Sequence, residues 1–111
     1  MSHQSVLIDQ SPLMDRAVLR ALADPMRQRI VELLAFEQLC TCHLVEDLGA
    51  TQTNVSNHLR VLRDAGLIAS EQAGRYTYHR LVPGPLDKVA SGLAELASRS
   101  RLALAVKRPC G

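Results

Sequence analysis

Apolar residues recur at helical spacing in the first third of the chain and divide it into two predicted helices. Intervals of three and four predict an amphipathic helix over residues 12–23. Asp24 is a good N-cap and Pro25 suits the first helical position, so a second helix is expected to begin there and to run to about residue 35. The apolar faces of these helices consist of Met14, Val18, Ala21, Leu22, Ile30, Val31, Leu33 and Leu34.

The next two predicted helices are separated by a short turn. Thr41 is expected to cap a short helix over about residues 42–48, and Gly49 follows it where a left-handed backbone is favoured. Thr51 then caps a longer helix that continues to about Ala65. One side of this longer helix is apolar and consists of Val55, Leu59 and Leu62. Two helices joined by a few residues that include glycine form the helix-turn-helix pattern.

The rest of the chain predicts a hairpin and a last helix. Two short strands, residues 67–72 and 76–81, flank the turn Ala73-Gly74-Arg75, and Pro83-Gly84-Pro85 is expected to break the chain before a helix over about residues 86–106. That helix carries an apolar seam of Leu86, Val89, Leu93 and Leu96. The seam favours a partner helix, although packing onto the protein's own core is the alternative. The expected fold class is therefore mainly α with a small β-hairpin: a winged helix-turn-helix, dimeric through its terminal helices.

Length and composition fit one domain. The 111 residues are 47% hydrophobic, which suffices for one core. We expect a flexible N-terminal arm over residues 1–11, a domain over residues 12–106 and a short basic tail over residues 107–111. No apolar run approaches the roughly 18 residues of a membrane span, and the polar start lacks the apolar stretch of a secretory signal. A cytoplasmic protein without a membrane partner is expected.

The distribution of polar groups argues for nucleic acid more strongly than the net charge, which is only +2. The side of the longer helix opposite its apolar stripe carries amide, hydroxyl and guanidinium groups, mostly in the first two turns: Gln52, Thr53, Ser56, Asn57 and Arg60. Those groups hydrogen-bond base edges and phosphates in the major groove. An ordinary solvated surface is the alternative, and the preceding short helix and turn favour DNA. Arg75, at the hairpin tip, suits either a phosphate contact or an exposed turn.

Three cysteines in a chain without an export signal indicate reduced thiols. Cys40 and Cys42 stand two residues apart at the start of the short helix. In a regular helix such a pair points to different sides, so both can hold one ion only where the backbone is extended or unwinds. Binding would then distort the short helix, which supports the longer helix with the polar side, the recognition helix of the pattern. The helix N-terminus favours the thiolate, especially at Cys42.

Four segments, LRALADPMRQRIVELL, LCTCHL, TQTNVSNHLRVLRDAGLI and GRYTYHRL, resemble in order and spacing the ArsR/SmtB family of metal-responsive transcriptional repressors. The resemblance covers about residues 13–100. It implies a homodimeric winged-helix repressor that binds a palindromic operator and releases it when an ion binds, and it implies no catalytic cofactor. The implied DNA contacts are Gln52, Thr53, Ser56, Asn57, His58, Arg60 and, in the wing, Arg75.

The segment Cys40-Thr41-Cys42-His43-Leu44 looks like the Cys-Val-Cys-Asp-Leu motif of arsenite- and antimonite-responsive members and of the cadmium- and lead-responsive branch. Val45 stands where the best-known arsenic sensors carry a third cysteine, and the N-terminal arm has none of the cysteines that cadmium and lead sensors recruit. Residues 86–106 contain no histidine, which argues against a zinc or nickel site of the kind that other members build on the last helix.

The leading hypothesis is a repressor of double-stranded operator DNA that responds to As(III) or Sb(III), with Cys40, Cys42 and Cys110 as ligands. Cys110 would reach the pair from the same chain or from the partner; a two-thiolate site completed by water or a buffer thiol is the competing view. Alternatives that keep the repressor are a redox switch at Cys40 and Cys42, or a sensor of cadmium, lead or another soft metal. A thiol enzyme is remote, because the chain lacks a thioredoxin-like Cys-x-x-Cys setting.

Overall fold

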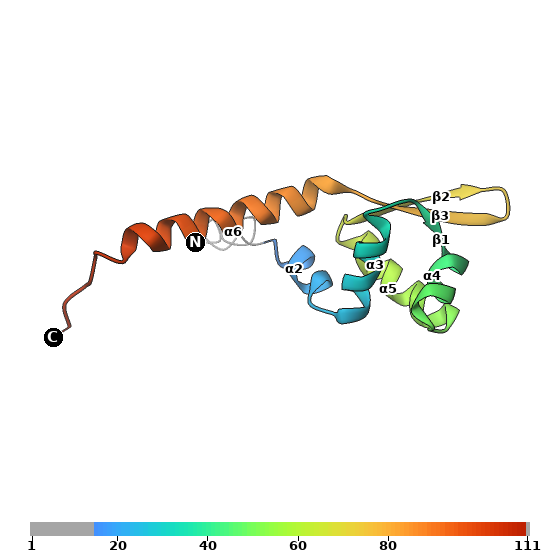
Figure 1. Ribbon diagram of the computed structural model, residues 1–111, viewed down its shortest axis with the longest axis horizontal. Coiled ribbons are helices and arrows are strands. Elements are labelled where there is room, and N and C mark those ends of the chain that lie inside the picture. The colour runs from blue at the N-terminus through green and yellow to red at the C-terminus, as the bar shows by residue number, and fades with distance from the viewer. Residues whose placement is uncertain (1–14, 111) are drawn as a thin grey trace, which may run out of the picture.

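The computed structural model describes residues 15–110, which form a winged helix-turn-helix (Figure 1). The elements in chain order are α2 (Arg16–Leu22), α3 (Pro25–Leu34), β1 (Leu39–Cys40), α4 (Thr41–Leu48), α5 (Gln52–Asp64), β2 (Ile68–Ala73), β3 (Tyr76–Leu81) and α6 (Pro83–Ala103). The predicted arm, residues 1–11, lies outside the described residues. The fold class is confirmed.

Side-chain caps fix where the first helices begin. The Asp24 carboxylate accepts a hydrogen bond from the Arg27 backbone N–H at 3.0 Å, and Pro25 occupies the first turn, as predicted. The helix before it begins at Arg16, later than expected, because Asp15 has an extended backbone and caps Val18 at 3.2 Å. The structure therefore shortens the first predicted helix at its N-terminal end.

Helix α6 begins at Pro83, not after the Pro-Gly-Pro segment as predicted. The first four N–H groups of a helix have no intrahelical acceptor, so prolines at the start cost no hydrogen bond and their fixed φ suits the helix. The predicted break is thus the first turn of α6. The helix ends at Ala103, a few residues earlier than residue 106.

The wing, defined here as the hairpin of β2 and β3, is part of a three-stranded antiparallel sheet with the order β1-β3-β2. Its strands pair from Ile68 with Leu81 to Ala73 with Tyr76, and Gly74 begins the tight turn with a φ of 65°. The two-residue strand β1 was not predicted. It pairs Cys40 with Tyr78 and so ties the start of α4 to the wing.

The core lies where α2, α3, α4 and α5 meet the sheet. Its fully buried side chains come from every one of these helices and from the segment before β2: Val18, Ile30, Leu44, Val55, Leu62 and Leu67. The predicted apolar stripe of α5, Val55, Leu59 and Leu62, is buried. Packing of that stripe leaves the polar side of α5 facing outward.

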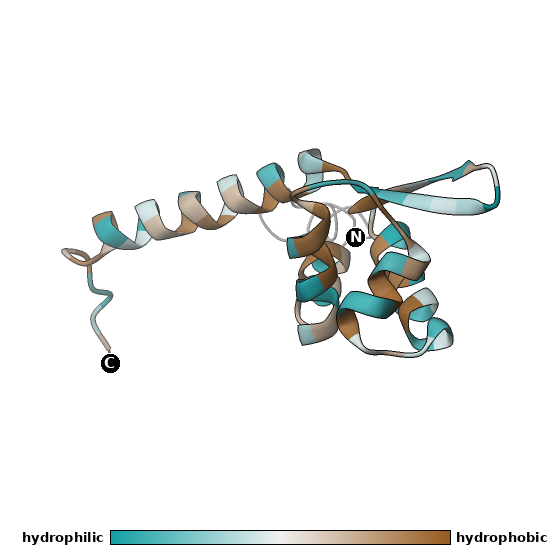
Figure 2. Ribbon diagram, turned by 45° about the vertical axis from the view of Figure 1, so that its right-hand side comes forward, coloured by the Kyte–Doolittle hydropathy of each residue, from teal (hydrophilic) through white to brown (hydrophobic). Residues whose placement is uncertain are grey.

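The wing and α6 extend from the core in opposite directions (Figure 1). Hydrophilic residues cover much of the wing, whereas hydrophobic residues recur along α6 (Figure 2). Val89 and Gly92 are the buried residues of α6, and Leu93 and Leu96 are 49% and 39% exposed. None of the described helices combines the length and apolarity that crossing a bilayer requires.

Candidate functional site

The Cys40 and Cys42 thiols come together at the junction of β1 and α4. Cys40 is the last residue of β1 and the N-cap of α4, with an extended backbone (φ −82°, ψ 165°), and Cys42 lies in the first turn. Thr41 was expected to be the cap but is the first helical residue. Because the backbone at Cys40 is already extended, both side chains line the same cavity, which is described below. Of the two conditions expected for a shared ion, an extended backbone or an unwound helix, the structure shows the first.

His43 completes the immediate surroundings of Cys40. Its Nδ1 accepts a hydrogen bond from the Cys40 backbone N–H at 3.2 Å and lies 3.1 Å from the Cys40 Sγ. This contact is the reciprocal half of a capping box, with histidine in the place usually taken by Glu or Gln. Cys40 is 2% exposed, whereas Cys42 is exposed.

The electrostatics of the pair favour the thiolate at Cys40. Burial opposes its ionisation, but the hydrogen bond from the Cys42 side chain and those from the backbone N–H groups of His43 and Cys42 outweigh burial and lower the pKa of Cys40. At Cys42 the hydrogen bond to Cys40, partial burial and the charge of Cys40 raise the pKa. The prediction that Cys42 would be favoured as the thiolate is wrong, because the capping position faces the helix N–H groups.

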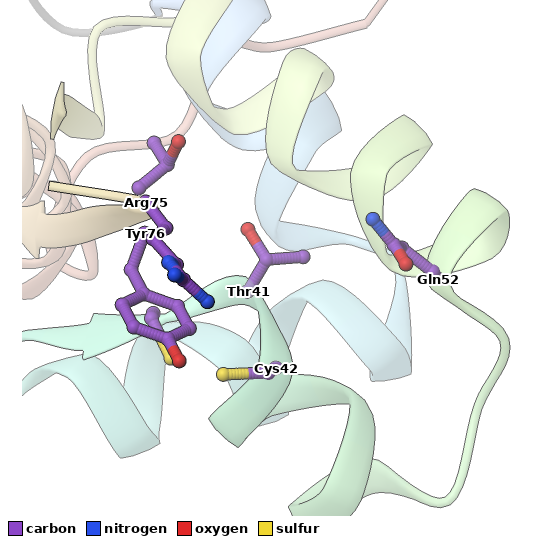
Figure 3. Close-up of a pocket in the computed structure, with 7 residues that line it drawn as sticks. Thr41, Cys42, Gln52, Arg75 and Tyr76 are labelled. Carbon is purple, nitrogen blue, oxygen red and sulfur yellow. The ribbon is translucent and has the colours of Figure 1, made fainter.

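A cavity of about 190 Å³ opens beside the thiols. It is lined by residues of β1, α4, α5 and the wing: Cys40, Thr41, Cys42, Gln52, Arg75, Tyr76 and Thr77. In Figure 3 the Arg75 side chain extends from the wing toward Thr41 and Cys42, and Gln52 stands at the start of α5. A second cavity of similar volume shares Cys40, Cys42 and Tyr76 and adds His43 and Tyr78. Two residues predicted to contact DNA therefore line the same space as both thiols.

Helix α5 presents the predicted polar face. Thr51 caps it by accepting a hydrogen bond from Asn54 N–H at 3.1 Å. Four of the predicted contacts are exposed and Ser56 is half-buried; the exposed ones are Gln52, Thr53, Asn57 and Arg60. His58 differs, because its Nδ1 lies 3.2 Å from Arg27 Nη1 and 3.8 Å from the Asp24 carboxylate, which ties it to the start of α3.

A buried histidine links the thiol site to the wing and to α5. His79 is 2% exposed; its Nε2 lies 2.9 Å from the Thr41 hydroxyl and its Nδ1 lies 2.7 Å from the Ser70 hydroxyl. Arg63 of α5 donates to Ser70 Oγ at 3.2 Å. Burial, and secondarily the charge of Arg63, lower the pKa of His79. The sequence placed His79 in the wing and gave it no role. The signal that could have revealed its burial is Leu81, an apolar residue two positions further along the strand and therefore on the same side of the sheet.

Cys110 lies in the C-terminal tail, beyond the end of α6 at Ala103. The tail that follows α6 and the helix α4 lie toward opposite ends of the molecule (Figure 1). It is exposed. Within residues 15–110, no three His, Cys, Asp or Glu side chains form a cluster that could hold a metal ion. One chain in this structure therefore brings Cys40 and Cys42 together but does not add Cys110 to them.

The helix pair, the exposed polar face of α5 and the wing define a winged helix-turn-helix regulator of the DNA-binding type. Residues 24–70 match the family described as bacterial regulatory protein, arsR family. The chain is 36% identical over 91 residues to the transcriptional regulator CmtR of Mycobacterium bovis, covering 82% of this chain and 74% of that protein. This chain belongs to the arsR family. The family and fold are those of DNA-binding regulators, not of enzymes.

Two further similarities concern arsenic. The arsenic resistance transcriptional regulator ArsR1 of Pseudomonas putida is 37% identical over 82 residues, which cover 70% of this chain and 64% of that relative. A crystal structure of a possible transcriptional regulator for arsenical resistance superposes with a TM-score of 0.66 at 30% identity, covering 81% of this chain and 96% of that one. The family prediction is thereby confirmed.

Proposed function

We propose that this protein is a transcriptional repressor that releases its operator when trivalent arsenic or antimony binds the Cys40 and Cys42 thiolates. One observation carries the proposal: both thiols line a cavity together with Gln52 at the start of the recognition helix and Arg75 in the wing. A soft ion bound there lies against the surface that reads DNA. The similarity to regulators named for arsenic resistance supports the choice of ion.

The DNA-binding surface consists of the exposed polar side of α5 and the tip of the wing. We assign base and phosphate contacts to Gln52, Thr53, Ser56, Asn57 and Arg60, and a phosphate contact outside the major groove to Arg75. His58 belongs to this set by position in the family motif. Its contacts with Arg27 and Asp24 support an indirect role, in which it fixes the start of α3 against α5.

The repressor acts as a homodimer through α6. The support is the half-exposed row of Leu93 and Leu96 beyond the last buried residue of that helix. A helix with this seam gains stability when a second apolar helix covers it. Two recognition helices related by a two-fold axis would then read half-sites about one helical turn apart. In such a dimer, Cys110 of the same chain or of the partner subunit remains the candidate for a third thiol, which the described residues of one chain do not bring to the pair.

Soft ions fit the pair better than hard ones. Two thiols, one of them with a lowered pKa, supply sulfur ligands that prefer arsenic, antimony, cadmium or lead to magnesium or calcium. The ligand set contains no carboxylate, and the histidine beside it already accepts a backbone hydrogen bond through Nδ1. Arsenic and antimony in the trivalent state match a small number of thiolates without further protein ligands.

The test is fluorescence anisotropy of the reduced full-length protein on its own upstream DNA, titrated with arsenite and antimonite and, as a control, with zinc. Release by micromolar arsenite without release by zinc is the expected result. A coupling free energy of about 1–3 kcal/mol corresponds to a 5- to 150-fold loss of DNA affinity. DNA binding that ignores both arsenite and antimonite contradicts the proposed inducer.

The same assay separates the alternatives. Cadmium and lead are added in place of arsenite to test the other soft metals. Peroxide in place of arsenite tests a redox switch, in which a sulfenic acid at one thiol condenses with the other. The cavity that both thiols line favours such a reaction, whereas the strain of a bridge between near neighbours opposes it. Release by peroxide alone would assign the pair to redox sensing.

A further inference from the structure

The thiol cavity contains polar side chains that no neighbour engages. The Thr41 hydroxyl is 2.9 Å from His79 Nε2, and the Thr77 hydroxyl donates to Gln72 at 3.1 Å. By contrast, neither the Arg75 guanidinium nor the Gln52 amide makes a side-chain hydrogen bond or ion pair with another residue in the described part of the chain. Both line the cavity. Two strong hydrogen-bonding groups without side-chain partners therefore line the same cavity as the thiols.

Trivalent arsenic forms three bonds, and the cavity offers two sulfurs. No third His, Cys, Asp or Glu joins them among residues 15–110. The third position of a bound ion consequently needs a ligand that the ion brings with it. Arsenite enters with three hydroxyl groups, so a retained hydroxyl is the simplest such ligand, and the cavity of about 190 Å³ has room for it beside the thiols.

We propose that the thiol pair binds arsenite with one hydroxyl retained, and that Arg75 and Gln52 hydrogen-bond this hydroxyl. The inference rests on the proposed function and specifies its ligand. Binding forms two sulfur–arsenic bonds and breaks two arsenic–oxygen bonds. Each thiol proton leaves with a displaced hydroxide as water, and arsenic stays trivalent. The Arg75 guanidinium donates to the hydroxyl oxygen, and the Gln52 amide can donate to the oxygen or accept from the proton.

This arrangement couples the ion to DNA without unwinding α4. Arg75 and Gln52 are the side chains that we assign to the operator, and each can satisfy either the arsenic-bound hydroxyl or the DNA. The bound ion therefore draws the wing tip and the start of α5 away from DNA. Since coupling between two ligands is reciprocal, DNA must weaken arsenite binding by the same factor.

The first test is arsenic X-ray absorption of the full-length reduced protein carrying one equivalent of arsenite in a thiol-free buffer. We expect two sulfur neighbours and one oxygen neighbour, in both the wild type and the Cys110→Ser variant. Three sulfur neighbours in the wild type would overturn the inference, because Cys110 of the partner subunit would then supply the third ligand.

The second test compares two probes that differ in the third group. Arsenite retains a hydroxyl, whereas methylarsonous acid carries a methyl group in its place, and both use two thiols. Binding is followed by the near-ultraviolet absorbance of the sulfur–arsenic bonds. We expect Arg75→Gln to weaken arsenite binding about 10-fold or more and Gln52→Ala to weaken it about 2- to 10-fold. The affinity for methylarsonous acid should change less than about 2-fold, since a methyl group accepts no hydrogen bond.

Matched controls keep the comparison specific. Arg80→Gln removes an exposed arginine from the same strand region, and Asn57→Ala removes a predicted DNA contact, yet neither residue lines the cavity. Both should bind arsenite as the wild type does. Equal losses for the two probes, or no loss in Arg75→Gln and Gln52→Ala, would overturn the role of these side chains. A wild type that binds no arsenite would refute the proposed function itself, whereas release of DNA with three sulfur neighbours would refute the inference alone.

Discussion

The cysteine at the junction of β1 and α4 and the cysteine in the tail beyond α6 have very different surroundings. Cys40 is buried at the junction of β1 and α4, where Cys42, His43 and backbone N–H groups contact its thiol. Cys110 is exposed in the tail beyond α6, and no interaction with another described residue involves it. A thiol is thus part of a site at the junction of β1 and α4, whereas in the tail it is exposed and has no neighbours among the described residues that form a site. A cysteine becomes a ligand through the backbone and neighbours that hold it, and these are visible for the pair alone.

The strongest test of this difference between the cysteines is to replace them with serine one at a time. We expect Cys40→Ser and Cys42→Ser to bind the operator but to lose the 5- to 150-fold response to arsenite almost completely, because one sulfur cannot anchor the ion. Cys110→Ser should keep the response. The measurement is anisotropy with and without arsenite. A fully inducible Cys40→Ser/Cys42→Ser double variant would remove the site from consideration.

The α6 end can be tested through its leucines. Leu96→Glu places a charge in the proposed seam, and burying an unpaired charge costs several kcal/mol, so we expect a monomer in sedimentation experiments. Operator affinity should fall by about 100-fold or more, because half of the contacts to a two-fold site are lost. Ser98→Glu, on the same exposed half of the helix, is the control. A Leu96→Glu variant that stays dimeric would place the interface elsewhere.

A smaller effect is expected at the side of α5 that we propose contacts DNA. Arg60→Ala should weaken operator binding by about 1–3 kcal/mol if the guanidinium reads a base, or reduce the salt slope by about 1 if it binds a phosphate. Arg99→Ala on α6, whose guanidinium pairs with Glu95 at 3.0 Å, is the matched control. Titrations at several salt concentrations distinguish the two cases. If affinity and slope both match the wild type, Arg60 does not contact DNA.

The smallest effect concerns the buried histidine between the thiol site and the wing. Burial lowers the pKa of His79 in the folded protein, so the unfolded chain binds a proton that the folded state resists. The stabilisation is present above the pKa of the unfolded state, near 6.5, and is lost as the pH falls through the lower folded value.

Thermal unfolding from pH 7.5 to pH 5 measures this contribution. The wild type should lose stability on acidification more steeply than His79→Gln, which has no titrating group at that position. At pH 7.5 the variant is expected to be the less stable protein, because the Ser70 and Thr41 hydroxyls lose their imidazole partner. Parallel curves for the two proteins would show that His79 does not contribute to the pH dependence.

Much of the fold followed from local sequence signals. The predicted helix starts are occupied by Asp24, Pro25 and Thr51. A carboxylate or hydroxyl at a cap accepts hydrogen bonds from N–H groups that have no acceptor within the helix. The apolar stripe of α5 was also predictable from local sequence, because apolar residues that recur every three to four positions lie on one side of an α-helix. The exposed positions of Gln52, Thr53, Asn57 and Arg60 then followed by geometry.

The missed features depend on contacts between distant segments. Strand β1 has two residues, too few to show a period, and forms because β3 offers it a partner 38 residues away. Its formation makes Cys40 extended, which in turn places the cap, the thiolate and the cavity where local reasoning did not. His79 is polar and carries no burial signal of its own; its position between Thr41 and Ser70 exists only in the folded sheet.

Cys40 is both the end of a strand and the start of a helix, and this double role also affects how fast the thiol pair can take up a ligand. Its backbone is fixed by pairing with Tyr78 before any ion arrives. Capturing a ligand therefore requires little further loss of backbone entropy, which otherwise costs about 1–2 kcal/mol for each residue that becomes ordered. Loading of the pair can then proceed at the pace of side-chain rotation and thiol exchange, without waiting for a segment to refold. Under the proposed function, such a regulator would answer a soft ion quickly and reset as soon as the ion is removed.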